Sequence, residues 1–191
     1  LNGGTYIFDG PTSGISIGGS TPNFIMSKGK YAFLNGAQLS IGGSAPNNVI
    51  CKGALTYNDC TVYFSGGGGI VTGGSNNLTL YPGTYIFDGG AGLNMSGSAN
   101  LTFKPGTYQF YFNSGADLAF QGSSSIKLNG TPYAQMWFYG NDSAKTTDQC
   151  PGGPNSSDLC LQGSTNFSIP SGEYYFEDGR VLAQGSSKIA G

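Results

Sequence analysis

Short segments of alternating apolar and polar residues, separated by glycine-rich turns, make up most of this chain. Alternation with a period of two is typical of a β-strand that buries one face. The pattern apolar–x–apolar–x–Gly–Ser occurs seven times, with Thr72 in place of one apolar residue, and the copies start 24, 31, 23, 25, 41 and 22 residues apart. They are "ISIGGS" (15–20), "LSIGGS" (39–44), "IVTGGS" (70–75), "LNMSGS" (93–98), "LAFQGS" (118–123), "LCLQGS" (159–164) and "VLAQGS" (181–186).

Two more alternating segments follow in each of the clearest units. The second follows a small polar spacer, as in "LTL" (78–80) and "LTF" (101–103). The third follows a glycine-containing turn and includes a tyrosine: "GTYIF" (4–8), "GKYAF" (29–33), "GTYIF" (83–87), "GTYQF" (106–110) and "GEYYF" (172–176). One unit is therefore three short strands in about 23 residues, as the shortest spacings of the Gly–Ser motif show.

Short strands that recur in one order predict a parallel β-helix, in which each coil stacks on the coil before it. We expect one all-β domain over residues 1–191, right-handed and three-sided, with about seven coils. The Gly–Ser glycines should line up at one corner, where glycine allows a backbone conformation closed to other residues. The inward residues of one coil would be Tyr85, Phe87, Leu93, Met95, Leu101 and Phe103, with equivalents in the coils above and below.

Two insertions interrupt the repeat, at residues 51–60 and 140–158, and each coincides with a pair of cysteines. Cys51 with Cys60 and Cys150 with Cys160 indicate two local disulfides, which form in an oxidising, extracytoplasmic setting. A metal site is the alternative for the four cysteines. It is disfavoured because the chain has no histidine and no C-x-x-C spacing.

Composition and charge narrow the class of protein. The chain has 34 glycines, 9% charged residues and a net charge of −2. Its eight basic residues are scattered, so we expect no binding to nucleic acid or to anionic membranes. No apolar run is long enough to span a membrane. The chain begins and ends within the repeat pattern, which indicates a segment of a longer extracellular or cell-surface protein.

The acidic residues favour turn chemistry over catalysis. Asp9, Asp88 and Glu177 are predicted to share a corner with Asn35 and Ser65, a composition typical of Asx turns. Acid–base catalysis by two carboxylates needs a separation of roughly 5–9.5 Å. Coils rise by about 4.8 Å, so carboxylates two or more coils apart lie at or beyond that range. We expect no catalytic residues, no cofactor and no enzymatic activity, with calcium at Asp9 or Asp88 as the alternative use of this corner.

The outward residues of the third strands predict a surface row that we call the aromatic stripe. An apolar and aromatic surface of this kind meets the protein's own flanking sequence, a protein partner, or a glycan. A threonine row (Thr5, Thr61, Thr84 and Thr107) runs beside it and suggests an ice-binding surface, but Lys30 and Glu173 interrupt it. The stripe comprises Ile7, Tyr63, Ile86, Tyr111, Trp137 or Tyr139, and Tyr175.

Three segments carry a resemblance to a known family: "LTLYPGTYIFDGGAGLNMSGSANLTFKPGTYQF" (78–110), "CTVYFSGGGGIVTGGSNNLTL" (60–80) and "NGTPYAQMWFYGND" (129–142). With its "PG-x-Y" segments, the chain resembles the glycine-rich extracytoplasmic β-helix region of TadG-like proteins of the tight-adherence (Tad/Flp) pilus-assembly system. The resemblance implies a cell-surface or pilus-associated role and transfers no catalytic residues. The chain departs from the family in lacking its N-terminal membrane helix and in the length of segment 140–158.

Together these observations predict a non-enzymatic structural or adhesive protein of the cell surface. Its coil ends would pair with other copies of the chain or with flanking segments, building filaments end to end. The alternative is a carbohydrate-active β-helix that binds surface glycans on the aromatic stripe or cleaves polysaccharide.

Overall fold

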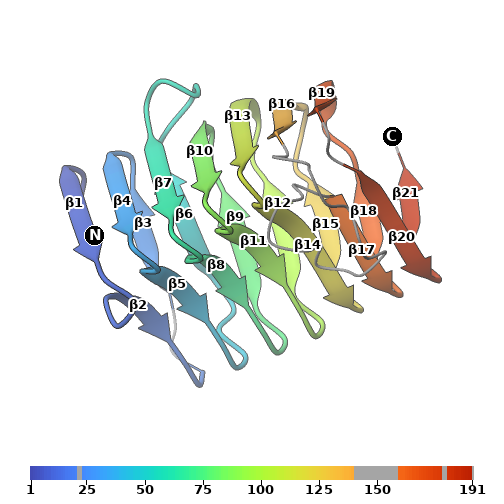
Figure 1. The fold of residues 1–191 in the computed structure, drawn as a ribbon, viewed down its shortest axis with the longest axis horizontal. Helices are drawn as coiled ribbons and strands as arrows, with labels where there is room; N and C mark the ends of the chain where they lie inside the picture. Colours follow the sequence, from blue (N-terminus) through green and yellow to red (C-terminus); the bar gives the residue numbers. More distant parts are fainter. Residues whose placement is uncertain (21–22, 140–158, 178–179, 191) are drawn as a thin grey trace.

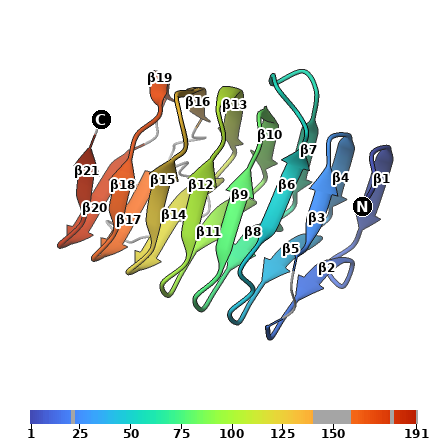
Figure 2. The same ribbon diagram turned by 180° about the vertical axis from the view of Figure 1, so that it is seen from behind.

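The computed structural model describes residues 1–20, 23–139, 159–177 and 180–190. Every regular element in these residues is a β-strand, and the 21 strands form three sheets of seven parallel strands each. Each strand pairs with the strand three places later in the chain, so the chain passes once through every sheet in each coil (Figures 1 and 2). The prediction of a three-sided parallel β-helix of about seven coils is confirmed.

The strand bounds show how the repeat divides among the three sheets. Sheet A contains β1 (Thr5–Asp9), β4 (Lys30–Leu34), β7 (Thr61–Ser65), β10 (Gly83–Asp88), β13 (Gly106–Asn113), β16 (Pro132–Tyr139) and β19 (Ser171–Glu177). Sheet B contains β2 (Gly14–Ile17), β5 (Gln38–Ile41), β8 (Gly69–Thr72), β11 (Gly92–Met95), β14 (Asp117–Gly122), β17 (Leu159–Gly163) and β20 (Val181–Gly185). Sheet C contains β3 (Ile25–Ser27), β6 (Asn48–Lys52), β9 (Asn77–Leu80), β12 (Asn100–Phe103), β15 (Ser125–Leu128), β18 (Asn166–Ser168) and β21 (Lys188–Ala190).

A column of seven phenylalanines, one per coil, runs along the inner face of sheet A. Neighbouring rings lie 4.6–5.3 Å apart between centroids and within 16° of parallel. Each stacked pair contributes about 0.5–1.5 kcal/mol beyond the burial of its apolar area. This phenylalanine column therefore ties every coil to the next. Its members are Phe8, Phe33, Phe64, Phe87, Phe112, Phe138 and Phe176.

The seven Gly–Ser glycines line up at the corner that follows sheet B, as predicted. All seven have φ between 69° and 94°, the left-handed region that favours glycine. A Cβ on Gly43 would lie 2.4 Å from the carbonyl oxygen of Gly19, and one on Gly74 would lie 2.4 Å from that of Gly43. Close approach of successive coils thus adds a second reason for glycine here. The column comprises Gly19, Gly43, Gly74, Gly97, Gly122, Gly163 and Gly185.

A tyrosine hydroxyl fastens the turn before sheet A in five coils, an arrangement we call the tyrosine lock. In each, the hydroxyl donates a hydrogen bond of 2.6–2.7 Å to the carbonyl four residues earlier. Burial raises the pKa of Tyr85 well above its usual value, so this hydroxyl stays a donor at all ordinary pH. The lock explains why the "G-x-Y" segments use tyrosine. The donors are Tyr6, Tyr31, Tyr85, Tyr108 and Tyr174.

The register of β13 differs from the simplest alignment of the repeats. Tyr85 pairs with Phe110 and Thr84 pairs with Gln109. The placement of Thr107 in the threonine row is therefore wrong, because Thr107 pairs with Tyr133 of the next coil. Strand β13 has eight residues and β10 has six, and the shift is two residues. A two-residue shift leaves every side chain on its original face, so the inward residues are as predicted.

Replacing a phenylalanine in the middle of the column should destabilise the fold strongly. We expect Phe87→Ala to lower the free energy of unfolding by about 3–5 kcal/mol, because it leaves a cavity in the core and removes ring contacts on both sides. Phe8→Ala is the matched control, since Phe8 is partly buried and stacks on one side. Chemical denaturation should show a loss less than half as large for Phe8→Ala, and equal losses would contradict a continuous column.

Removing the hydroxyl of one tyrosine lock isolates its hydrogen bond. Tyr85→Phe should cost about 0.5–1.5 kcal/mol in the free energy of unfolding, the usual net value of such a bond. Tyr63→Phe serves as the control, since its hydroxyl lies 3.5 Å from Asp88 Oδ2 on the outer face. Thermal denaturation followed by circular dichroism should separate the two variants. A stability for Tyr85→Phe equal to that of Tyr63→Phe would show that the lock contributes nothing.

Candidate functional site

The aromatic stripe forms one column on the outer face of sheet A. Strand register aligns Ile7, Ala32, Tyr63, Ile86, Tyr111, Trp137 and Tyr175. Of the two candidates in β16, Trp137 belongs to the stripe, whereas Tyr139 lies in the next column beside Asn113. Ile7 is 67% exposed and Tyr175 is 51% exposed, so both ends of the stripe face solvent.

The rings in the stripe stack on each other along the solenoid. Tyr111 and Trp137 lie 4.6 Å apart with planes 7° from parallel. Because these residues are neighbours in successive coils, each ring covers one face of the other, and both side chains are partly exposed. Tyr175 and Tyr139 are 6.0 Å apart and tilted by 53°. A sugar that stacks on aromatic residues needs an open ring face, and among these four rings Tyr175 is the most exposed.

A polar row accompanies the stripe on the same face. Thr84 Oγ1 lies 3.5 Å from Gln109 Oε1, Gln109 Nε2 donates to Gln135 Oε1 at 3.4 Å, and Gln135 Nε2 donates to Glu173 Oε2 at 2.8 Å. At the other end of this polar row, Lys30 interrupts the predicted threonine row, since it pairs with Thr5 and with Thr61. Glutamine and glutamate thus occupy the C-terminal half of the row, which is hydrogen-bonded from coil to coil.

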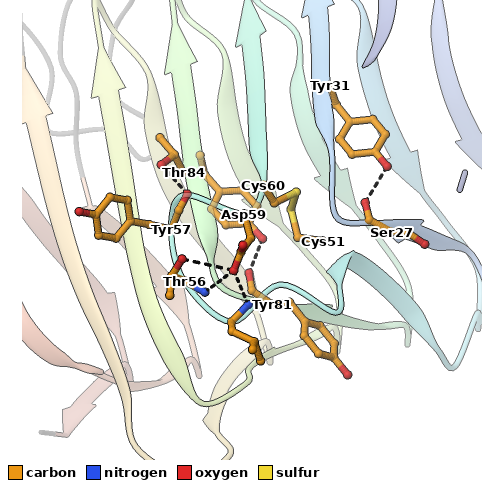
Figure 3. Close-up of a disulfide and its surroundings, with 11 residues drawn as sticks. Ser27, Tyr31, Cys51, Thr56, Tyr57, Asp59, Cys60, Tyr81 and Thr84 are labelled. Carbon is orange, nitrogen blue, oxygen red and sulfur yellow. Dashed lines mark hydrogen bonds between the residues drawn. A yellow bond between two sulfur atoms is a disulfide. The ribbon is translucent and has the colours of Figure 1, made fainter. Parts of the chain in front are cut away.

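A loop held by a disulfide lies against β10 of sheet A, where it contacts Thr84 (Figure 3). Cys51 and Cys60 form the predicted disulfide, with their Cα atoms 5.8 Å apart. Cys51 sits at an irregularity in the pairing of β6 with β3 and has a φ of 62°, which turns its side chain into the core. Cys51 and Lys52 therefore belong to β6, and the excursion predicted over 51–60 begins at residue 53.

Hydrogen bonds hold this loop in shape and against sheet A. Asp59 accepts bonds of 2.9 Å from the backbone N–H groups of Leu55 and Thr56, and these lower the pKa of its carboxyl group. The Thr84 hydroxyl donates to the carbonyl of Tyr57 at 3.0 Å. Leu55 is left 75% exposed on the loop. The loop, which connects β6 to β7, therefore reaches over β10 and exposes the Leu55 side chain to solvent.

Tyr57 lies on this loop close to the aromatic stripe, because its carbonyl accepts the hydrogen bond from Thr84, which stands two residues before Ile86 on the same strand. Partial burial raises the pKa of the Tyr111 phenol, and the nearby phenols of Tyr139 and Tyr57 raise it further. The repeat could not reveal Tyr57, because the insertion has no equivalent in other coils. Its position inside the cysteine-flanked insertion that leads into β7, the strand of Tyr63, was the available signal. The candidate surface therefore combines the stripe, Tyr139 and Tyr57.

The second predicted disulfide lies partly outside the described residues. Cys160 is buried in β17. Cys150 and the whole insertion at 140–158 fall outside the part of the chain that the structure describes. The pairing of Cys150 with Cys160 therefore stays a prediction.

The acidic corner does not form a cluster. Asp9 pairs with Leu34, so Asn35 lies one residue beyond the corner position predicted for it. The Nδ2 group of Asn35 nevertheless donates a hydrogen bond of 2.7 Å to Asp9 Oδ1. Ser65 shares the column with Asp88, as predicted. Asp9 and Asp88 are three coils apart, which separates these two calcium candidates. In the described residues no group of three or more histidine, cysteine, aspartate or glutamate side chains is placed to bind a metal ion.

Comparison of the chain with protein-family models, with curated proteins and with solved structures found no match. Among the described residues there is no helix with the length and apolar character needed to cross a membrane. The candidate surface therefore rests on its own geometry, a partly exposed aromatic stripe flanked by a polar row and by a loop held by a disulfide.

The disulfide should stabilise the loop and the coil beneath it. Removing it with the double substitution Cys51→Ser and Cys60→Ser should lower the free energy of unfolding by roughly 2–3 kcal/mol, the chain-entropy value for a loop this short. Proteolysis should then cleave first within residues 53–60. Leu55→Ser, with the disulfide intact, is the control for loop composition. Unchanged stability and unchanged cleavage in the cysteine variant would show that the hydrogen bonds of Asp59 hold the loop alone.

Proposed function

We propose that this protein is a non-enzymatic structural or adhesive module of the cell exterior, either cell-surface or pilus-associated. The observation that carries the proposal is the phenylalanine column, which continues through all seven coils without a break. A rod with one uninterrupted core and three continuous hydrogen-bonded sheets resists bending and local opening. Such a rod suits a stalk or spacer that holds a contact surface away from the cell.

The exterior location is supported by cysteine chemistry and by the family resemblance. The disulfide between Cys51 and Cys60 is of a kind that persists in oxidising compartments. The resemblance to TadG-like proteins of the tight-adherence pilus system implies the same compartment. Both point to a protein that works outside the cytoplasm.

Two surfaces are suited to partners. The aromatic stripe, with Tyr57 and Leu55 beside it, offers an exposed apolar face of the kind that packs against another protein. The coil ends offer strand edges, because β1 and β19 each pair on one side. Either a flanking segment or another copy of the chain could continue the sheets at these edges.

The second candidate function is glycan binding, and one observation favours it. Tyr175 is 51% exposed and lies beside the hydrogen-bonding groups of Gln135 and Glu173. An open ring next to polar side chains is a common arrangement for holding a sugar. Against this, Tyr111 and Trp137 each cover one face of the other, which removes two of the ring faces on which a glycan could stack.

Immunogold labelling tests the proposed location and role directly. Antibodies raised against the chain should label intact, unpermeabilised cells of the source organism at the surface or on surface filaments. Preimmune serum on the same cells is the control. Label that appears after permeabilisation alone, inside the cell, would contradict the proposal.

A glycan array distinguishes the two candidate functions. The structural proposal predicts no sugar-dependent binding by the chain, and no difference between it and the variants Trp137→Ala and Tyr175→Ala. Tyr133→Ala is the matched control, since Tyr133 is an exposed tyrosine of β16 outside the stripe. Binding to a defined glycan that Tyr175→Ala abolishes and Tyr133→Ala preserves would favour the carbohydrate-binding function instead.

A further inference from the structure

We propose that Tyr139 and Tyr175 are a site of oxidative cross-linking, at which a peroxidase with hydrogen peroxide joins the two rings as dityrosine. The link would tie β16 to β19, which lie side by side in sheet A (Figures 1 and 2). The inference rests on the proposed exterior role, because the reaction needs an oxidising setting of the kind found outside the cytoplasm. It names a covalent modification that would strengthen the rod.

The two rings are in contact on the outer face of sheet A. The ring centroids of Tyr139 and Tyr175 lie 6.0 Å apart, and the ring planes are tilted by 53°. Aromatic rings with centroids about 4.5–7 Å apart touch each other. Tyr175 is 51% exposed and Tyr139 is partly exposed, so an oxidant in solution can reach both phenols. The pair therefore combines ring contact with access from solvent.

A second tyrosine pair shows that contact alone is not sufficient. Tyr6 and Tyr31 have centroids 5.3 Å apart, but their planes are 4° from parallel. The new bond of dityrosine joins two ring carbons and lies in the plane of both rings, so parallel stacked rings must swing apart before they can bond. Both hydroxyls of this pair also donate to backbone carbonyls in the tyrosine lock, and Tyr31 is 2% exposed.

The tilt of the outer pair fits the geometry of the product. Rings joined by a single bond between ring carbons can be twisted about that bond, so a tilt such as the 53° between Tyr139 and Tyr175 is compatible with coupling. The second side-chain torsion of tyrosine is broad, which allows each ring to turn its edge toward the other. Of the two tyrosine–tyrosine ring contacts in the part of the chain that the structure describes, this one is suited to dityrosine.

The coupling is balanced with hydrogen peroxide as the oxidant. Each phenol gives up one electron and one proton, which leaves two tyrosyl radicals. The ortho carbons of the two radicals form one C–C bond. Each ring then becomes aromatic again as the hydrogen on the bonded carbon moves to the phenol oxygen. Hydrogen peroxide accepts the two electrons and two protons and leaves as two molecules of water, so the chain loses two hydrogens.

A bond at this place would hold together strands that are distant in the chain. The insertion at 140–158, β17 and β18 all lie between β16 and β19 in the sequence. The Cys51–Cys60 disulfide closes the shorter insertion in a similar way. A cross-link that closes a longer loop removes more entropy from the unfolded chain. Oxidation of the pair would thus stabilise the coils of β16 and β19 against unfolding.

Treatment of the dilute 191-residue chain with hydrogen peroxide and a haem peroxidase tests the proposal. The monomer should gain dityrosine fluorescence and lose the mass of two hydrogens, and peptide mapping should join the segments of Tyr139 and Tyr175. Tyr139→Phe and Tyr175→Phe keep the ring but remove the phenol, so each should lower the dityrosine yield of the monomer at least tenfold.

Tyr133→Phe is the matched control for this experiment, since Tyr133 is an exposed tyrosine of β16 outside the pair. It should leave the dityrosine yield of the monomer unchanged. A monomer without dityrosine, a yield that Tyr175→Phe leaves unchanged, or a map that joins other tyrosines would overturn the proposal.

Thermal unfolding followed by circular dichroism measures the effect of the link on stability. The cross-linked chain should unfold at a higher temperature than the untreated chain, and the oxidised Tyr175→Phe variant should not. Equal unfolding temperatures before and after cross-linking would reject the stabilising role. The immunogold experiment is independent, so surface label without dityrosine would reject the cross-link and keep the proposed function, and dityrosine without surface label would do the reverse.

Discussion

Parallel, in-register stacking of equivalent side chains is the constraint on which this structure depends. Each coil is too small to bury its own apolar residues, so a residue such as Phe87 is stable because Phe64 and Phe112 cover its two faces. The same requirement sets the corners, where Gly43 and Gly74 approach neighbouring backbone too closely for any side chain. It also sets the turns, where the Tyr85 hydroxyl closes onto the carbonyl of Tyr81. Stability is therefore shared along the axis and does not belong to any single coil.

This constraint also shapes the outer surface. Because each strand lies directly over its equivalent, outward residues form rows, and a row of aromatic residues becomes a stack of rings such as Tyr111 on Trp137. Polar residues likewise bond to their equivalents, as Gln135 does to Glu173. The outer face of sheet A is thus a regular surface suited to extended contacts. The loop at 53–60 is the described feature that breaks this regularity, and it brings Tyr57 to the stripe.

Repetition made the fold predictable and also limited the prediction. The inward residues, the glycine column and the Cys51–Cys60 disulfide follow from patterns that recur or pair locally, so the sequence alone was sufficient. The register of β13 was harder to predict, because Tyr108 resembles Tyr85 in sequence yet pairs with Gly83, two residues earlier in β10. Asn48 occupies a core position opposite Leu78, where its Nδ2 donates to two backbone carbonyls that alternation cannot reveal. The irregularity at Cys51 and the position of Tyr57 depend on non-repeating contacts.

Hydrogen–deuterium exchange, measured where the chain is monomeric, tests the stacking account most directly. If the coils stabilise one another along the axis, amide protection should be highest in the coils of β7, β10 and β13 and should fall toward both ends. It should be similar in the three sheets of any one coil. Protection that instead differs from sheet to sheet within a coil, or that is greatest in an end coil, would contradict a structure held together by coil-on-coil stacking.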